Sequence, residues 1–176
     1  MLKINMGCGK RNFGKEWIHI DEANFEHIDH KDIFNFPYEN VDLIYASHLI
    51  SYFDHGTLNK LLQYWRSKLS LGGILRLAVP DFKKICYLYT HNWELKYFTG
   101  PLYGKMLCNE KTIFHKTCFD ESTLTEILKE NNFRNIRLWD HRKVDHGVYD
   151  DHSQAYIPHM DKENGTLISL NIECEK

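Results

Sequence analysis

The sequence feature that most limits the possible folds lies in the first 21 residues. A short apolar strand is predicted at 2–6, and it runs directly into a Gly-x-Gly turn at 7–9. A second short strand at 17–20 ends in Asp21. A glycine turn after a first strand lets a ligand approach the backbone, and an acid after the next strand can accept both hydroxyls of a ribose. The pattern therefore indicates a nucleoside-binding site.

The residues around this turn favour a nucleoside without phosphates. A dinucleotide site carries a third glycine, in the pattern G-x-G-x-x-G, but residues 10–12 contain none. The chain also lacks a G-x-x-x-x-G-K-[ST] phosphate loop. S-adenosylmethionine is the common cofactor of this kind, whereas NAD or a nucleotide sugar is a less favoured alternative. The predicted cofactor-binding residues here are Met6, Gly7, Cys8, Gly9 and Asp21.

Strands and helices alternate along the rest of the chain. Further strands are predicted near 26–28, 41–46, 73–79, 133–139 and 166–174, and helices near 55–70, 82–92 and 121–131. Gly72 and Gly73 are expected to end the first helix, because glycine readily adopts a left-handed cap. The alternation predicts an α/β, Rossmann-like sheet of seven mostly parallel strands with helices on both faces. Only about ten residues separate the first two strands, so that crossover is expected to be shortened.

The middle of the chain carries a resemblance to a known family. A Leu-Gly-Gly turn at 71–73 leads into a strand that ends in Val-Pro-Asp at 79–81. This arrangement resembles the class I S-adenosylmethionine-dependent methyltransferases, and the similarity extends over nearly the whole chain. Within that superfamily the chain is similar to a small group of predicted methyltransferases, some of them linked with polysaccharide biosynthesis. The resemblance implies methyl transfer from S-adenosylmethionine and a last strand inserted antiparallel beside the fifth.

The resemblance also implies further contacts to the cofactor. Asp32 and the backbone amide of Ile33 would recognise the adenine edge, and Ser47 and His48 would contact cofactor and acceptor. Many relatives read SHVLEHF where this chain reads SHLISYF at 47–53, so their Glu-His pair is replaced. A catalytically silent protein that binds S-adenosylmethionine or its demethylated product is therefore a second hypothesis.

A catalytic base is needed only for some acceptors. The cofactor supplies the reactivity, and the protein aligns the nucleophile. An amine acceptor needs little more, whereas a hydroxyl benefits from a general base. Candidates for catalytic residues are His115, Asp81 and His48, with His159 as a further possible base. His115 is the first choice, because it lies between an irregular aromatic segment and the helix predicted at 121–131.

The acceptor itself is only partly restricted by the sequence. The Asn/Asp-Pro-Pro-Tyr signature of amino-group methylation is absent, and so is the Pro-Cys nucleophile of pyrimidine methylation. A small molecule, a carbohydrate-type precursor or a protein side chain remains, as a hydroxyl or amine. The irregular segments 93–119 and 141–165 are expected to form the acceptor pocket, the first of them as a lid.

Composition limits the remaining function classes. At 176 residues the chain is expected to form one domain, 1–176. Its net charge of −2 argues against general nucleic-acid binding, and no stretch suits a membrane span. Five cysteines without a C-x-x-C indicate a reduced, cytoplasmic protein without a zinc site. The acids and histidines at 150–159 are expected to be solvated, so no metal is predicted. The oligomeric state is left open.

Overall fold

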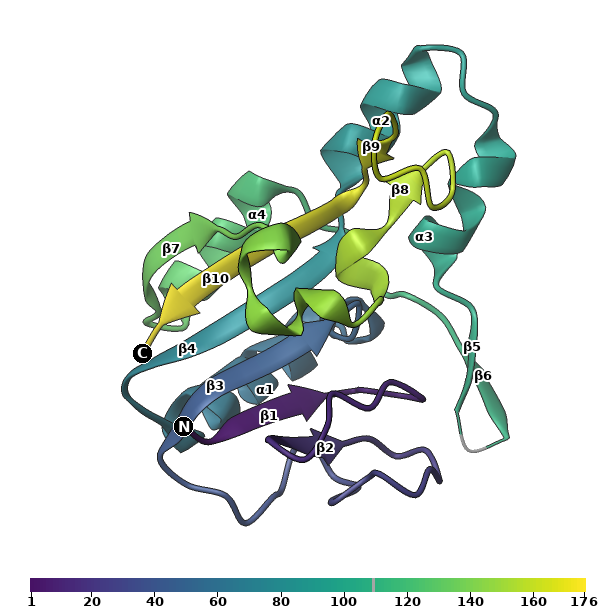
Figure 1. The fold of residues 1–176 in the computed structure, drawn as a ribbon. Helices are drawn as coiled ribbons and strands as arrows, with labels where there is room; N and C mark the ends of the chain where they lie inside the picture. The colour runs from purple at the N-terminus through teal and green to yellow at the C-terminus, as the bar shows by residue number, and fades with distance from the viewer. Residues whose placement is uncertain (109) are drawn as a thin grey trace.

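The computed structural model of the chain describes residues 1–108 and 110–176, which contain a central sheet of six strands (Figure 1). In spatial order these are β2 (Trp17–Ile20), β1 (Lys3–Met6), β3 (Val41–Ser47), β4 (Leu69–Pro80), β10 (Ser169–Glu175) and β7 (Arg134–Leu138). The first four are parallel, and β10 lies antiparallel between β4 and β7. The prediction of a mostly parallel α/β sheet with an antiparallel last strand is confirmed.

The prediction of seven strands is wrong for the described residues, since the span expected at 26–28 forms turns. Only a single bridge joins His30 to Ile20 at the edge of β2. The Asp29 carboxylate accepts a hydrogen bond from the His19 amide at 2.8 Å. A side chain thus occupies a backbone donor that a further strand would use, and the ladder stops there.

The first long helix ends earlier than the glycines predict. Helix α1 (His55–Lys68) passes directly into β4 at Leu69, and Gly72 and Gly73 lie within the strand. A Cβ on Gly73 would lie 2.7 Å from the Val41 carbonyl oxygen. Glycine is therefore required here by the close approach of β3 and β4, where the strand register shifts, rather than by a helix cap.

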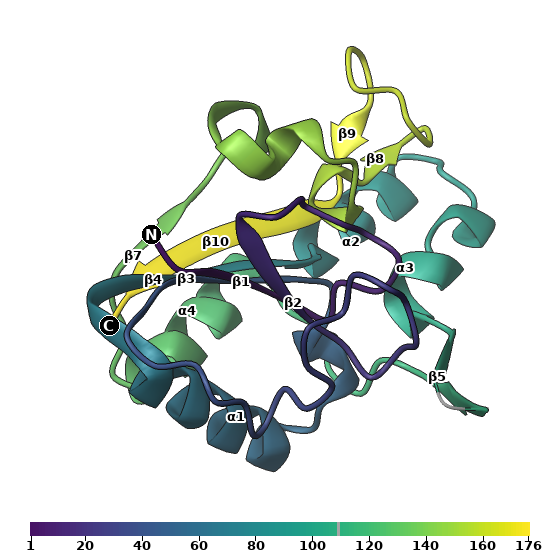
Figure 2. The same ribbon diagram turned by 60° about the horizontal axis from the view of Figure 1, so that its bottom comes forward.

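One face of the sheet is covered by α1 and α4 (Glu121–Glu130), which lie side by side beneath it in Figure 2. Asp54 and Asp120 begin the two helices by accepting hydrogen bonds from the amides three residues later. Both helices bury leucines against the strands, and Trp65 is fully enclosed in this main core. Burial of this apolar face supplies most of the driving force for the fold.

Within residues 1–108 and 110–176 the opposite face carries no helices of this kind, so the prediction of helices on both faces is corrected. The connections 7–16 and 21–40 are turns and loops. Three short 3₁₀ turns instead cover this face: η3 (His141–Lys143), η4 (Asp145–Val148) and η5 (His152–Gln154). They close over a second, aromatic cluster that includes Phe13, Trp17, Tyr45 and Trp139.

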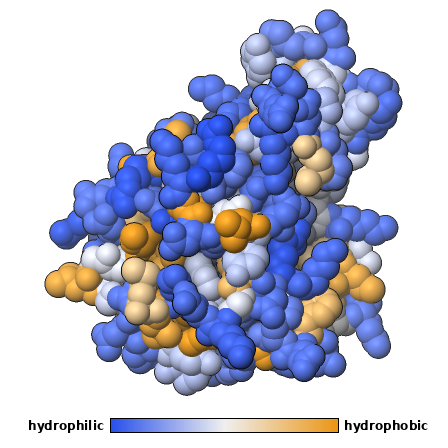
Figure 3. All heavy atoms as spheres, viewed as in Figure 1, coloured by the Kyte–Doolittle hydropathy of each residue, from blue (hydrophilic) through white to orange (hydrophobic). Residues whose placement is uncertain are grey.

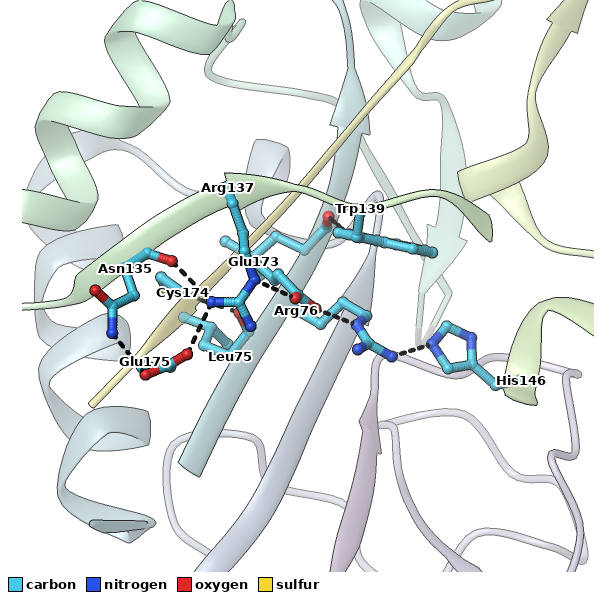
Figure 4. A network of polar contacts seen from close by, with 10 residues as sticks. Leu75, Arg76, Asn135, Arg137, Trp139, His146, Glu173, Cys174 and Glu175 are labelled. Carbon is cyan, nitrogen blue, oxygen red and sulfur yellow. Dashed lines mark hydrogen bonds and ion pairs between the residues drawn. The ribbon is translucent and has the colours of Figure 1, made fainter. Parts of the chain in front are cut away.

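A polar network fastens this second cover to the sheet (Figure 4). The two carboxylate oxygens of buried Glu173 accept hydrogen bonds from Arg76 at 2.8 Å and Arg137 at 2.9 Å. Arg76 also reaches His146 of η4, at 3.1 Å between nitrogens. Burial, followed by the charge of Arg76, lowers the pKa of His146 to about 3. The neutral imidazole accepts from Arg76, and the network joins β4, β10, β7 and η4.

The remaining elements project from the carboxyl end of the sheet. They are α2 (Phe82–Thr90), η2 (Leu95–Tyr97), α3 (Thr99–Tyr103), the hairpin β5 (Met106–Cys108) and β6 (Lys111–Ile113), and the pair β8 (Tyr156–Ile157) and β9 (Thr166–Leu167). The 3₁₀ turn η1 (Ile50–Tyr52) follows β3 at the same end. The hairpin of β5 and β6 lies on the same side of the molecule as β2 in Figure 1. In Figure 3 apolar side chains lie at that edge, and further apolar groups lie at the lower left and near the centre of a mostly hydrophilic face. Leu107, at 73% exposure, is part of the hairpin.

Candidate active site at the carboxyl edge of the sheet

The candidate site lies at the point in the sheet where successive strands are added on opposite sides of β1. β2 lies on one side of β1 and β3 on the other, so the carboxyl ends of β1 and β3 flank a topological switch point. Ligands of open α/β sheets bind in the crevice at such a point. A cavity of about 850 Å³ opens there, large enough for a nucleoside cofactor and a second molecule. Of the residues predicted from the sequence, the cavity is lined by Gly7, Gly9, Asp21, Ser47, His48 and His115.

The turn after β1 depends on its two glycines for different reasons. Both have positive φ, +63° at Gly7 and +54° at Gly9. A Cβ on Gly7 would lie 2.8 Å from Cδ1 of Leu49, so a branched residue there would disturb both backbone and packing. A Cβ on Gly9 would meet nothing within 4 Å. Gly9 therefore exposes its backbone to the open cavity.

Asp21 is oriented by the same turn. One carboxylate oxygen accepts from the Gly9 amide at 2.8 Å, and the other from the Ala23 amide at 2.7 Å. A carboxylate offers about four acceptor positions, so both oxygens retain capacity for a ligand hydroxyl. The hydrogen bond thus joins Gly9 and Asp21, which are 12 positions apart in the sequence, into one unit. In this unit the carboxylate of Asp21 faces the cavity beside the backbone of Gly9, which carries no side chain.

Met6 and Cys8 can reach a ligand only through their backbone. The Met6 side chain is fully buried in the main core, and that of Cys8 is also buried, with its sulfur 3.9 Å from Nε2 of His27. Burial, aided by the charge of Asp21, raises the pKa of the Cys8 thiol to about 12. The thiol is therefore protonated and unreactive near neutral pH.

Asp32 and Ile33 are not brought to the cavity lining. Asp32 is exposed and accepts from the Phe34 amide at 2.8 Å, closing a local turn. The Ile33 side chain is buried in the main core, and its carbonyl accepts from the Trp65 indole at 2.9 Å. Their predicted contact with an adenine ring stays a prediction.

His48 lies at the end of β3 with a positive φ of +52°. Its Nε2 lies 3.3 Å from the Ser169 hydroxyl, and its ring stacks on His152 with centroids 5.1 Å apart. Burial is the largest cause that lowers the pKa of both rings, and the positive charge of Arg11 lowers both further. Two neutral imidazoles therefore lie together on one wall of the cavity near neutral pH.

His115 lines the cavity but its ring is held tightly. Nδ1 lies 3.1 Å from the Pro101 carbonyl, which makes Nδ1 the protonated nitrogen. Nε2 is buried without a partner among the described residues, and a Cβ on Gly104 would lie 2.1 Å from it. Burial lowers the pKa of His115. The ring is a neutral acceptor, enclosed by the backbone after α3.

The residues that replace the relatives' Glu-His pair have a structural role here. Tyr52 donates from its hydroxyl to the Gly104 carbonyl, and its ring meets that of His115 edge-on with centroids 4.6 Å apart. The Ser51 carbonyl accepts from the Lys116 amide at 2.8 Å. Both residues thus tie the segment 93–119 to the end of β3.

Asp81 lies outside the cavity lining. Its carboxylate accepts from the Lys84 amide at 3.1 Å and caps helix α2. Its catalytic role stays a prediction without a supporting contact. The exposed His159, in contrast, does line the cavity.

Several cavity residues were not identified from the sequence. Arg11 and Lys105 line it, one from the loop after β1 and the other from the corner before β5. Arg11 donates from Nε to the Asp150 carbonyl at 3.1 Å. That contact joins residues 139 positions apart, so no local pattern signals it.

The described residues form neither a metal-binding cluster nor a membrane-spanning helix. Within residues 1–108 and 110–176, no group of three or more His, Cys, Asp or Glu side chains is arranged to hold a metal ion. Across the same residues, no helix is both long and apolar enough to cross a bilayer.

No protein-family model and no curated protein sequence matches the chain. Solved structures of similar fold include an S-adenosylmethionine-dependent methyltransferase from Archaeoglobus fulgidus, with 16% identity and a TM-score of 0.56, over 99% of this chain and 85% of that one. Human N-acetylserotonin methyltransferase in complex with S-adenosylmethionine shows 14% identity and a TM-score of 0.58, over 99% of this chain and 47% of its own.

A third structure is the 1,6-didemethyltoxoflavin-N1-methyltransferase of Burkholderia thailandensis, bound to that substrate and to S-adenosylhomocysteine. It shows 11% identity and a TM-score of 0.55, over 99% of this chain and 70% of its own. At these identities the likeness concerns the backbone. The chain has the α/β fold of the S-adenosylmethionine-dependent methyltransferases.

Proposed function

We propose that the chain is a methyltransferase that uses S-adenosylmethionine. The observation that carries the proposal is the Gly9–Asp21 unit, an oriented carboxylate beside a bare backbone at the switch point of this fold. Asp21 would hold the ribose hydroxyls, and the backbone at 7–9 would lie along the methionine part. When bound, S-adenosylmethionine supplies an electrophilic methyl group on its sulfonium.

The rest of the cavity would receive the acceptor. Its walls include the aromatic rings of Phe25, Tyr52, Tyr97 and Tyr156. Such rings are suited to the apolar faces of a small molecule or a sugar, and this supports a carbohydrate-type or other small acceptor. Two of the structural neighbours named above are named for different small molecules, N-acetylserotonin and 1,6-didemethyltoxoflavin, so the fold by itself does not select an acceptor.

A hydroxyl acceptor would need a base, and the cavity histidines are the candidates. His48 and His115 both carry a neutral ring near neutral pH, the state that accepts a proton. His115 could act only after Gly104 moves away from Nε2, which makes its role depend on motion of the segment 93–119. An amine acceptor would need alignment in the cavity without any of these bases.

The experiment is transfer of a labelled methyl group from S-adenosylmethionine to fractionated cell extract. We expect label in a small-molecule or glycan fraction with the wild-type protein, and little with Asp21→Ala. The alternative is a protein that binds the cofactor without transfer. Labelling no greater than that of Asp21→Ala in every fraction, with intact S-adenosylhomocysteine binding, would establish that alternative.

A further inference from the structure

The cavity contains cationic side chains that have no acidic partner among the residues that the structure describes. Lys10, Arg11 and Lys105 all line it, and none forms an ion pair with the residues the structure describes. Arg11 is half-buried, whereas the two lysines are exposed. An unpaired arginine inside a ligand cavity is unusual enough to point to a ligand group.

The acids of the cavity are committed to protein donors. Asp150 is paired with Lys162 at 3.0 Å, and buried Asp151 accepts from the Tyr45 hydroxyl at 2.5 Å. Asp21 is held by two backbone amides. The acids are therefore oriented by other groups and leave the charge of Arg11 without a carboxylate partner.

Arg11 is also positioned for recognition. Its Nε donates to the Asp150 carbonyl at 3.1 Å, which holds the guanidinium at one nitrogen. Among residues 1–108 and 110–176 the four terminal N–H donors have no hydrogen-bond partner. Arg11, His48 and His152 all line the cavity, and the positive charge of Arg11 lowers the pKa of both histidines. A fixed guanidinium matches the paired oxygens of a carboxylate or phosphate.

We propose that Arg11, aided by Lys105, binds an anionic group of the methyl acceptor, a carboxylate or a phosphate. The inference rests on the proposed function, because it takes the methyl acceptor to be the ligand that occupies the cavity beside the cofactor-binding turn. It narrows the acceptor from any small or carbohydrate-type molecule to an acidic one. The net charge of −2 makes this a local property of the cavity rather than a consequence of a basic protein.

The test is an NMR titration of the protein saturated with S-adenosylhomocysteine. The probes are D-glucuronate, D-glucose 1-phosphate and, as the neutral counterpart, D-glucose. We expect an anionic sugar to bind about tenfold more tightly than glucose, with the two anions deciding between carboxylate and phosphate. Arg11→Gln should remove this preference and leave S-adenosylhomocysteine affinity within about twofold. Arg134→Gln, an exposed arginine on β7, should change neither.

Three results would overturn the proposal. In the first, glucose binds as tightly as the two anionic sugars. In the second, none of the three probes binds at concentrations of tens of millimolar. Alternatively, Arg11→Gln could weaken S-adenosylhomocysteine binding itself by about tenfold or more, which would assign Arg11 to the cofactor carboxylate. If S-adenosylhomocysteine does not bind the wild-type protein, the proposed function fails separately. The same comparison of probes in the ligand-free protein then decides whether Arg11 holds an anion.

Discussion

Replacement of Asp21 by alanine should affect both stability and cofactor binding, by amounts that the structure allows to be separated. The substitution removes the partner of the Gly9 amide and that of the Ala23 amide. Two hydrogen bonds to a charged group are worth about 3–6 kcal/mol when buried. Gly9 and Ala23 are both half-exposed, so water can replace part of what their amides lose. We therefore expect a loss of about 1–3 kcal/mol in the free energy of unfolding.

The effect on binding comes from a different set of contacts. If the ribose hydroxyls bind Asp21, the alanine variant leaves them unpaired, which costs about 1–3 kcal/mol. This corresponds to a dissociation constant for S-adenosylhomocysteine that rises by about 5- to 150-fold. Asp21→Asn should be intermediate, because one atom of its amide can still accept while the other opposes a backbone N–H.

The assay pairs calorimetric titration of S-adenosylhomocysteine with urea unfolding of the same samples. Asp42→Ala is the matched control, since its carboxylate also accepts from a backbone amide, that of Leu2 at 2.7 Å, at the other end of the sheet. It should lower stability and leave the affinity unchanged. If Asp21→Ala is folded at the assay temperature and binds as tightly as Asp42→Ala, Asp21 does not hold the ribose.

Three further predictions concern the rest of the chain. The pKa of His146 falls from 6.5 to about 3 in the folded state. The unfolded chain therefore binds the proton first, and this group should cost about 2 kcal/mol of stability between pH 7 and 5. Urea unfolding of His146→Gln should show a shallower acid loss, and an unchanged slope would refute this. Glu173→Ala leaves Arg76 and Arg137 without their shared partner and should cost about 3 kcal/mol. Glu175→Ala, at a half-exposed site, should cost clearly less than Glu173→Ala, and equal losses would contradict the burial argument. Hydrogen exchange in the segment 93–119 should be fast without ligand and slower with S-adenosylhomocysteine, and insensitivity to ligand would argue against a lid.

The parts of the fold that the sequence predicted well are those set by local patterns. The first strand, the glycine turn and Asp21 lie within 20 residues, and the structure joins them by the Gly9–Asp21 hydrogen bond. The helix predicted near 121–131 is observed as α4 (Glu121–Glu130), with Asp120 as its N-cap. Apolar periodicity also identified the buried strands of the central sheet.

The parts that it missed depend on distant partners. A pair of glycines in a sequence is equally consistent with a helix cap and with a close approach of two strands. For Gly73 the structure shows the second, because the Val41 carbonyl lies too close for a side chain. The covering of the second face by 3₁₀ turns depends on aromatic packing between Phe13 and residues near 146. The contact of Arg11 with Asp150 and the close packing of the His115 ring against Gly104 could not be predicted from the sequence, because both arise from tertiary packing.

The central claim is that the unit formed by Gly9 and Asp21 holds S-adenosylmethionine. Calorimetric titration with S-adenosylhomocysteine, NAD and UDP tests it most directly. The account predicts that one S-adenosylhomocysteine binds per chain, with a dissociation constant of about micromolar order, or about 8 kcal/mol of binding free energy. It predicts no measurable heat with NAD or UDP. Binding of either of these in place of S-adenosylhomocysteine, or no binding of S-adenosylhomocysteine to the folded protein, would contradict it.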